Sequence, residues 1–483
     1  MELKNLFDQV IAFAQKCGMS ENTSDSKGNC VIRKNIKIEN GKFKSDAAYF
    51  GFIREDQGET DVYEDYSLVF FPLVDNSACV VALGIGTGGI VNDGDLASKP
   101  WIRRLFTKLY RDGAKTFFKN DFGDVETYSA DLWNEIKTNS DYQGLKKCFE
   151  KYRNYIPACE ILDFPKDGSK DEANFEIIKS WIATYAYLRN WPTKAELNKI
   201  EKYIPKVEDK AINIDSIFSI LHENRFVILQ GAPGTGKTHS ALEVAKKFFK
   251  DDNVFFEQFH AETTYSDFIY GIRPKLNSHN VEYEAITGKM YEAIDAAEKA
   301  KKKGNDEIFL LIIDEINRAN LSNVLGPVFY LFEKNDSNHY YSIKIGDKKI
   351  NSLPDNLYVI ATMNTADRSL AVVDFALRRR FTWLTLKPHK IDKKDIKAPQ
   401  KYFDNKRFDV FNYFFDRYAT DEELNLQPGQ SYFIVSNEDE MKNRLRYELM
   451  PLMKEYFNEG FLLSAKDEVS NYFQKELGVL MYE

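Results

Sequence analysis

The stretch RFVILQGAPGTGKTHSALEVAKKFF, residues 225–249, constrains the fold of this chain of 483 residues more than any other. It predicts a buried strand over 226–229, a glycine-rich loop, and a helix over 240–249. The loop matches G-x-x-x-x-G-K-[ST], and a strand before it with a helix after it is the context that confirms this phosphate-binding motif. The predicted phosphate-binding residues are Gly231, Ala232, Pro233, Gly234, Thr235, Gly236, Lys237 and Thr238.

The residue types of this loop suit a nucleoside triphosphate with Mg²⁺. Glycines let backbone N–H groups close around phosphate oxygens, and the helix N-terminus adds partial positive charge. Lys237 is expected to reach the outer phosphates, and the Thr238 hydroxyl is expected to bind Mg²⁺. A second glycine cluster, GIGTGG at 84–89, is followed by loop-like residues, so we interpret it as a turn that ends a strand.

Two further apolar runs, 308–313 and 357–363, predict strands that are covered on both faces, as in a parallel sheet. Ligands of such sheets bind at the carboxyl ends of the strands. Asp314 and Glu315 follow the first strand, and Asn364 follows the second. We expect Asp314 to contribute to the Mg²⁺ shell, Glu315 to polarise the attacking water, and Asn364 to hold that water or the γ-phosphate.

Three arginines, Arg378–Arg380, end the next predicted helix. An arginine can supply positive charge to phosphoryl transfer on the nucleotide of a neighbouring subunit. The helix dipole alone also favours basic residues at this position. We favour Arg379 as the trans-acting residue, although the sequence does not separate it from Arg378. This interpretation predicts a homo-oligomer with active sites between subunits.

Three strings together resemble McrB, the AAA+ subunit of modification-dependent restriction systems: GAPGTGKT, LLIIDEINRANLS and MNTADRSLAVVDFALRRRF. The resemblance covers about 205–460. It implies an α/β fold of the AAA+ P-loop NTPase class, with a parallel sheet and a helical lid. It also implies a hexameric ring, hydrolysis of GTP in preference to ATP, a role in antiphage defence, and an McrC-like endonuclease subunit that cuts DNA. The chain itself has no recognisable nuclease pattern.

A MoxR-like ATPase that remodels a protein client is the alternative, because a phosphate loop does not distinguish the two classes. The string MNTADRS favours McrB. The choice between GTP and ATP stays open at this point, since no residue can be named that reads the base.

The predicted organisation is an N-terminal α+β domain over 1–195, a linker over 196–210, the large αβ domain over 211–386 and the lid over 387–483. Segments 66–73 and 78–83 predict paired strands, and 335–353 predicts a hairpin.

Segment 99–120 is rich in basic residues and predicts an amphipathic helix with Arg104, Lys108 and Arg111 on one face. Such a face can bind DNA phosphates, or it can be an ordinary solvated side. The resemblance places a target-recognition domain ahead of the AAA+ module, which favours DNA, modified or not, as its ligand.

Composition limits the remaining classes. The net charge of −8 excludes a uniformly basic nucleic-acid coat, although a local basic face is compatible with it. No apolar run approaches membrane length, and the N-terminus has no signal-peptide pattern. The five cysteines have no metal-binding spacing. We therefore expect a cytoplasmic protein with reduced thiols and no membrane contact.

Overall fold

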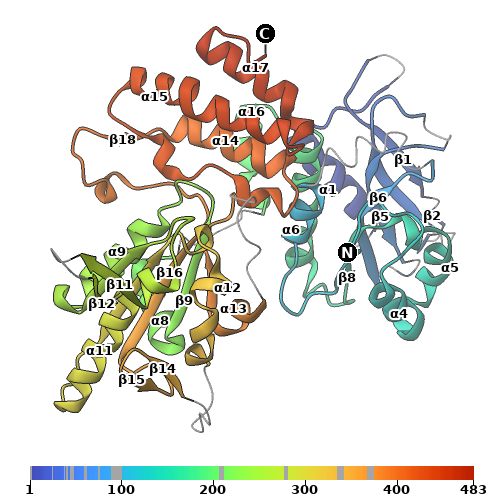
Figure 1. The fold of residues 1–483 in the computed structure, drawn as a ribbon. Helices are drawn as coiled ribbons and strands as arrows, with labels where there is room; N and C mark the ends of the chain where they lie inside the picture. Colours follow the sequence, from blue (N-terminus) through green and yellow to red (C-terminus); the bar gives the residue numbers. More distant parts are fainter. Residues whose placement is uncertain are drawn as a thin grey trace. The chain divides into compact units, whose positions relative to one another are not determined.

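A computed structural model of the chain contains two compact units, Met1–Glu208 and Asp209–Glu483 (Figure 1). It describes residues 3–23, 26–36, 38–39, 42–43, 48–58, 62–73, 75, 77–88, 101–205, 212–276, 281–333, 342–366 and 375–482. The first unit extends past the domain end expected at 195. Helix α7 (Lys194–Ile200) occupies the start of the expected linker, and Trp191 and Ile200 are buried in the core of the first unit.

The first unit is built on a six-stranded sheet whose neighbouring strands all pair antiparallel. Its order is β1 (Val31–Asn35), β4 (Tyr49–Ile53), β5 (Tyr66–Pro72), β6 (Ala78–Ile85), β8 (Ala158–Asp163) and β7 (Thr116–Phe118). A separate two-stranded pair is formed by β2 (Ile38–Glu39) and β3 (Lys42–Phe43). Strands and helices of this kind confirm the expected α+β class, and the predicted pairing of 66–73 with 78–83 is confirmed.

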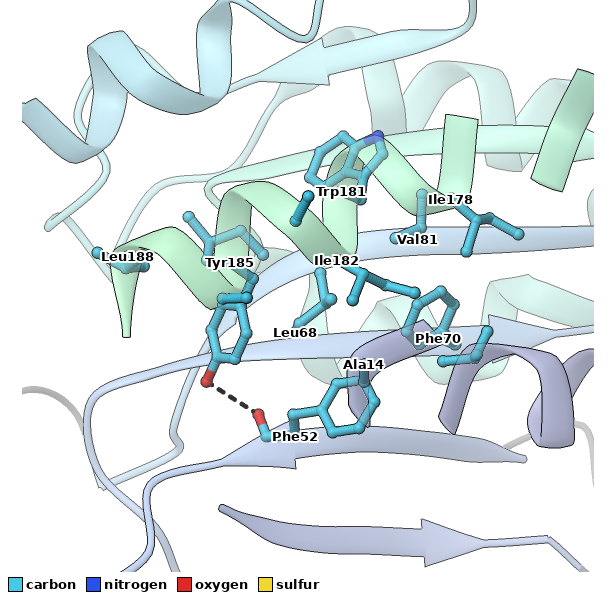
Figure 2. Packing of buried hydrophobic residues seen from close by; sticks show 14 of the residues in the cluster. Ala14, Phe52, Leu68, Phe70, Val81, Ile178, Trp181, Ile182, Tyr185 and Leu188 are labelled. Carbon is cyan, nitrogen blue, oxygen red and sulfur yellow. Dashed lines mark hydrogen bonds between the residues drawn. The ribbon is translucent and has the colours of Figure 1, made fainter. Parts of the chain in front are cut away.

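Helices cover both faces of this sheet, which is why its central strands are almost wholly buried. Helices α1 (Leu3–Lys16) and α6 (Asp171–Leu188) contribute to the larger core. In Figure 2, Ile182 of α6 lies beside Leu68 and Phe70 of the sheet, and the Tyr185 hydroxyl donates a hydrogen bond of 3.1 Å to the Phe52 carbonyl. Helices α4 (Ala130–Thr138) and α5 (Gln143–Tyr152) pack in a second core that receives the opposite side chains of β5 and β6.

The helix expected within 99–120 is shorter than its basic pattern indicates. Helix α3 spans Trp101–Thr107, and the chain then turns with Gly113 in the left-handed region, at φ 75°, before it enters β7. Lys108 and Arg111 therefore do not lie on a helical face with Arg104, and this part of the prediction is wrong. The reason is tertiary, because the segment after Gly113 pairs with β8.

The second unit contains a five-stranded parallel sheet, as predicted. Its order is β10 (Val254–Gln258), β13 (Phe309–Asp314), β16 (Leu357–Asn364), β9 (Phe226–Gly231) and β17 (Thr382–Thr385). Helices α8 (Ile214–Asn224) and α9 (Lys237–Phe248) share one core with the sheet. Helices α11 (Lys289–Lys302), α12 (Leu321–Val324) and α13 (Phe375–Arg380) belong to the core on its other face.

The C-terminal part of this unit, for which a lid was predicted, is mostly helical and has its own aromatic-rich core; we refer to it as the lid. Its helices, red and orange in Figure 1, are α14 (Asn405–Tyr418), α15 (Glu438–Arg444), α16 (Met450–Asn458) and α17 (Lys466–Leu477). The short strands β18 (Tyr402–Phe403) and β19 (Ile434–Val435) pair antiparallel beside them.

Two hairpins project from the large αβ domain. The first pairs β14 (Ile343–Ile345) with β15 (Lys348–Ile350), within the segment for which a hairpin was predicted. The second pairs β11 (Tyr270–Leu276) with β12 (Val281–Thr287), after the one-turn helix α10 (Tyr265–Phe268), and the sequence analysis did not foresee it. Ile272 and Tyr283 of this hairpin are exposed. The hairpin therefore lacks a buried face, and without one the sequence has no alternation of buried and exposed residues that would predict it.

The cysteines are free and buried, as expected for structural thiols. Burial raises the pKa of Cys17, Cys30 and Cys148 each to about 12, so these thiols stay protonated at neutral pH. In the described part of the chain, no helix combines the length and apolar character that a membrane crossing requires.

Candidate functional site

Strand β9 leads directly into the phosphate loop, and helix α9 leaves it, as predicted. Gly234 and Gly236 have φ angles of 79° and 84°, in the left-handed region that glycine adopts without steric cost. Gly236 is the N-cap of α9, which begins at Lys237. The loop therefore places backbone N–H groups and the positive end of a helix dipole at one point, which is the geometry of a phosphate site.

The ammonium group of Lys237 lies inside the loop. Its Nζ donates hydrogen bonds to the carbonyl oxygens of Gly231 and Ala232, both at 2.9 Å. Thr235 is buried and donates from its hydroxyl to the same Ala232 carbonyl, also at 2.9 Å. Because an ammonium group is a donor with no acceptor function, Lys237 can exchange these carbonyls for phosphate oxygens.

Asp314, at the end of β13, holds two hydroxyl groups. Thr238 Oγ1 and Thr362 Oγ1 each donate to Asp314 Oδ1 at 2.7 Å. The Asp314 side chain is buried beside the phosphate loop. A hydroxyl next to a carboxylate is a set of hard oxygen donors, which is what Mg²⁺ prefers. The two residues predicted to serve the metal, Thr238 and Asp314, are thus brought together, and their chemistry fits the ion.

Glu315 has a left-handed backbone, with φ 56° and ψ 46°, although it is not glycine. Such a conformation costs about 1–3 kcal/mol and is kept where the surroundings hold it, often at functional sites. Here the Glu315 N–H donates to Thr362 Oγ1 at 3.0 Å, and the Arg318 guanidinium pairs with the carboxylate. The left-handed residue ends the strand abruptly, and the Glu315 side chain stays partly exposed to solvent.

Thr362 is a site residue that the sequence analysis missed. Its hydroxyl donates to Asp314 and accepts from the Glu315 N–H, so one side chain connects both acids. The signal that could have found it is a buried hydroxyl in the otherwise apolar strand LYVIATM, two positions before Asn364. A buried polar side chain in such a strand needs a partner, and here the partners are functional groups.

Asn364 is the last residue of β16 and stands in register with Gly231, the first residue of the phosphate loop. Its Oδ1 accepts a hydrogen bond from the Ala366 N–H at 3.3 Å. Buried Asn317 donates from Nδ2 to the Asn364 carbonyl at 3.2 Å. The asparagine that was expected at this sheet edge therefore lies beside the phosphate loop.

The three arginines of α13 lie in different environments. Arg380 is buried, with its guanidinium 5.6 Å from the Phe329 ring centroid and paired with Glu333. Arg379 is exposed and donates to Glu333 Oε1 at 2.7 Å. Arg378 is also exposed and lies 5.4 Å from the centroid of Trp383. Burial makes Arg380 a structural residue, so Arg378 and Arg379 are the two arginines of α13 that are exposed to solvent.

In the first unit, the basic residues predicted to contact DNA are not equivalent. The Arg111 guanidinium pairs with Glu160, a buried carboxylate that also accepts a hydrogen bond of 3.0 Å from Trp181 Nε1. Arg111 therefore neutralises a buried charge, a structural role that charge patterning alone does not reveal. Lys108 and Arg111 line a pocket of about 430 Å³, and its other lining residues are Leu109, Ser180, Glu201, Lys202, Tyr203, Ile204 and Pro205. Arg104 belongs to α3.

Comparisons with known proteins agree with this geometry. The family described as AAA domain (dynein-related subfamily) matches residues 226–381. The type IV methyl-directed restriction enzyme EcoKMcrB subunit of Escherichia coli K12 is 33% identical over 267 residues, which are 50% of this chain and 56% of that protein. The type II restriction enzyme BsuMI component YdiS of Bacillus subtilis 168 is 29% identical over 240 residues, 42% of this chain and 68% of that protein.

The matched region thus spans little more than half the length of the first relative. Among solved structures, NtrX from Brucella abortus overlays on 56% of this chain and 55% of that chain, with 12% identity and a TM-score of 0.23, which adds no weight to the assignment. Both curated relatives are components of restriction enzymes, so the alternative of a MoxR-like remodelling ATPase is not favoured. With its phosphate loop, its paired strand-end acids and these matches, the chain contains an McrB-like AAA+ domain.

Proposed function

We propose that this chain is the nucleotide-hydrolysing recognition subunit of an McrBC-type restriction endonuclease, and that GTP is its preferred substrate. The observation that carries the hydrolase part is the arrangement at Asp314, whose carboxylate holds the hydroxyls of Thr238 and Thr362. The restriction part is supported by the relatives, which are a methyl-directed restriction subunit and a BsuMI component.

Each residue of the site has a defined task in this proposal. The phosphate-loop N–H groups and Lys237 bind the outer phosphates. Thr238 and Asp314 are the residues that would hold Mg²⁺, which would supply neutralising charge to the phosphates. Glu315 accepts the proton of the attacking water, and Asn364 orients that water from the neighbouring strand end. The amide of Asn364 does this without adding negative charge beside the γ-phosphate.

The remaining parts of the proposal concern assembly. We place this chain in a homo-oligomeric ring, a hexamer, with an McrC-like endonuclease subunit that performs the cleavage. The first unit recognises DNA, with Arg104 and Lys108 as contacts to phosphate. Arg111 contributes less to DNA contact than the charge pattern indicated, because its charge is committed to Glu160. Nucleotide hydrolysis then drives translocation or signalling to the nuclease.

The experiment that tests the proposal is steady-state phosphate release from GTP and from ATP by the purified chain, with and without DNA and an McrC-like partner. Preferential hydrolysis of GTP would support the McrB-type assignment. Hydrolysis of ATP alone would contradict the proposed substrate. If neither nucleotide is hydrolysed even with the partner present, the hydrolase proposal fails.

Arg379→Ala should leave nucleotide binding intact and lower the turnover of assembled protein about a thousandfold, because a trans-acting arginine stabilises charge only in the transition state. Mixing Arg379→Ala with Lys237→Ala protein provides the decisive measurement. The first variant binds nucleotide, and the second offers its intact Arg379 to a neighbour, so turnover should recover on mixing. Turnover that stays low in the mixture, or that falls with Arg378→Ala instead, would contradict the role given to Arg379.

A further inference from the structure

A segment of the lid, Gly429–Ser431, is hydrogen-bonded to the backbone of the phosphate loop. Three successive carbonyls of the loop accept hydrogen bonds from three successive lid residues. The pairs are Gly429 N–H to the Pro233 carbonyl at 2.9 Å, Ser431 N–H to the Gly234 carbonyl at 3.1 Å, and Gln430 Nε2 to the Thr235 carbonyl at 2.8 Å. We call Gly429–Ser431 the lid clamp.

The close approach depends on glycine at 429. A Cβ at this position would lie 2.0 Å from the Gly234 carbonyl carbon and 2.2 Å from the Thr235 nitrogen. The backbone of Gly429 itself is ordinary, with φ −72° and ψ 170°, so the requirement comes from the phosphate loop and not from local conformation. Any side chain at 429 would therefore push the lid away from the loop.

The lid clamp is firmly attached to the lid. The Ser431 carbonyl accepts a hydrogen bond of 2.8 Å from Arg444 of α15. Phe433, two residues later, is fully buried in the lid core and packs edge-on against Phe408, with ring centroids 5.4 Å apart. A displacement of the phosphate loop must therefore move the lid core with it, or break the three hydrogen bonds.

These contacts bear on phosphate binding through peptide geometry. In a trans peptide the C=O and the following N–H point in opposite directions. Because the Pro233 and Thr235 carbonyls point towards the lid clamp, the N–H groups of Gly234 and Gly236 point away from it. Those N–H groups are the donors that an anion-binding loop presents to phosphate oxygens.

Gln430 has one further feature that points to a ligand. The side chain is only 6% exposed, and its Oε1 is buried without a hydrogen-bond donor from any described residue. A buried acceptor without a partner is costly, and in native proteins it calls for a specific explanation. A donor that enters the site with the nucleotide, such as a hydroxyl, an amino group or a bound water, would satisfy this oxygen.

We propose that Gln430 is a positioning residue of the nucleotide site and that the lid clamp holds the phosphate loop in its phosphate-binding form. The inference rests on the proposed function, since its ligand is the same nucleoside triphosphate. It adds a task for the lid, which contacts the loop backbone and thereby couples lid position to phosphate binding.

Two variants test the clamp, each with a matched control in the same unit. Gln430→Met removes both amide groups at similar volume, and Gln427→Met does the same at a buried lid glutamine whose Nε2 donates to Asn412 at 3.0 Å, away from the loop. Gly429→Ala inserts a methyl group against the loop, and Gly326→Ala inserts one where nothing lies within 4 Å. The measurements are the Kd for a fluorescent GTP or ATP analogue with Mg²⁺ and the melting temperature without nucleotide.

Gln430→Met should raise Kd about fivefold, and Gly429→Ala more than about tenfold, while both controls keep the wild-type Kd. The melting temperature should fall by a similar amount in the two glutamine variants, so that they differ only in their affinity for the nucleotide. A wild-type Kd in Gln430→Met would contradict the proposed role of the lid clamp but would leave the proposed function intact. This result does not depend on whether Gly429→Ala folds. A wild-type protein that binds neither nucleotide would overturn both, before any variant is compared.

Discussion

Lys237→Ala is expected to abolish nucleotide binding, with a rise in Kd of at least about a hundredfold. The ammonium group now bonded to the Gly231 and Ala232 carbonyls is the only side-chain cation that the loop 231–238 itself contributes. Contacts between a cation and phosphate oxygens are charge-assisted, and they are about twice as strong as neutral hydrogen bonds. Removal of this cation leaves the backbone N–H groups to hold the phosphates without a compensating charge.

The measurement is titration with a fluorescent GTP or ATP analogue, followed by the melting temperature with and without nucleotide. Lys246→Ala is the control, because Lys246 is an exposed lysine of the same helix α9. Both variants lose one positive charge from one helix, so a general electrostatic effect would appear in both. Nucleotide binding by Lys237→Ala at wild-type affinity would contradict the assignment of this loop as the phosphate site.

The placement of the candidate catalytic residues could be predicted from the sequence, because it depends on residues that are neighbours in the chain. Strands β13 and β16 are continuous apolar runs, and parallel strands that are buried on both faces end at a common edge. Asp314 and Glu315 follow directly on the apolar run of β13, and Asn364 ends β16, so their approximate positions follow from the sheet. The glycine-rich loop carries its own signature in spacing and residue type.

The features that could not be predicted are contacts between distant parts of the chain. Arg111 looked like part of a basic helical face, and its actual partner Glu160 lies 49 residues away. The bond from Gln430 to the Thr235 carbonyl spans 195 residues. Periodicity reports only whether a residue faces a core or solvent, and it carries no information about which distant group will meet it.

Tertiary pairing explains the helix that was wrongly predicted in the first unit, and the lack of a buried face explains the hairpin that was not predicted in the second. The segment after Thr107 has the apolar spacing of a helix, yet 116–118 pairs as a strand with β8 because that sheet edge is available. Tertiary pairing overrides local propensity here. The hairpin β11–β12 has charged pairs on one side, such as Lys275 with Glu284 at 3.0 Å, and exposed apolar residues on the other. Because neither face of the hairpin is buried, its sequence pattern resembles that of an irregular surface segment.

Glu315→Gln is expected to keep nucleotide affinity within about threefold of wild type and to lower turnover at least about a hundredfold. The amide has the size of the carboxylate, but it cannot take a proton from the attacking water. Affinity should survive because the phosphate loop and the Thr238–Asp314 pair are untouched. The conformational cost of the backbone is also unchanged, since glutamine, like glutamate, must adopt the left-handed conformation found at this position, at φ 56°.

Single-turnover phosphate release, measured together with Kd, checks this prediction. Glu292→Gln is the matched control, because Glu292 makes the same kind of carboxylate pair, with Lys289 at 2.7 Å, on helix α11. A loss of turnover in Glu315→Gln alone would show that a proton acceptor is needed at this strand end. If turnover persists at the wild-type rate while binding stays tight, the general base is another group, and Glu315 serves only to hold Arg318. If Lys237→Ala loses nucleotide binding and Glu315→Gln loses only turnover, the two variants distinguish the phosphate-binding loop from the group that activates water.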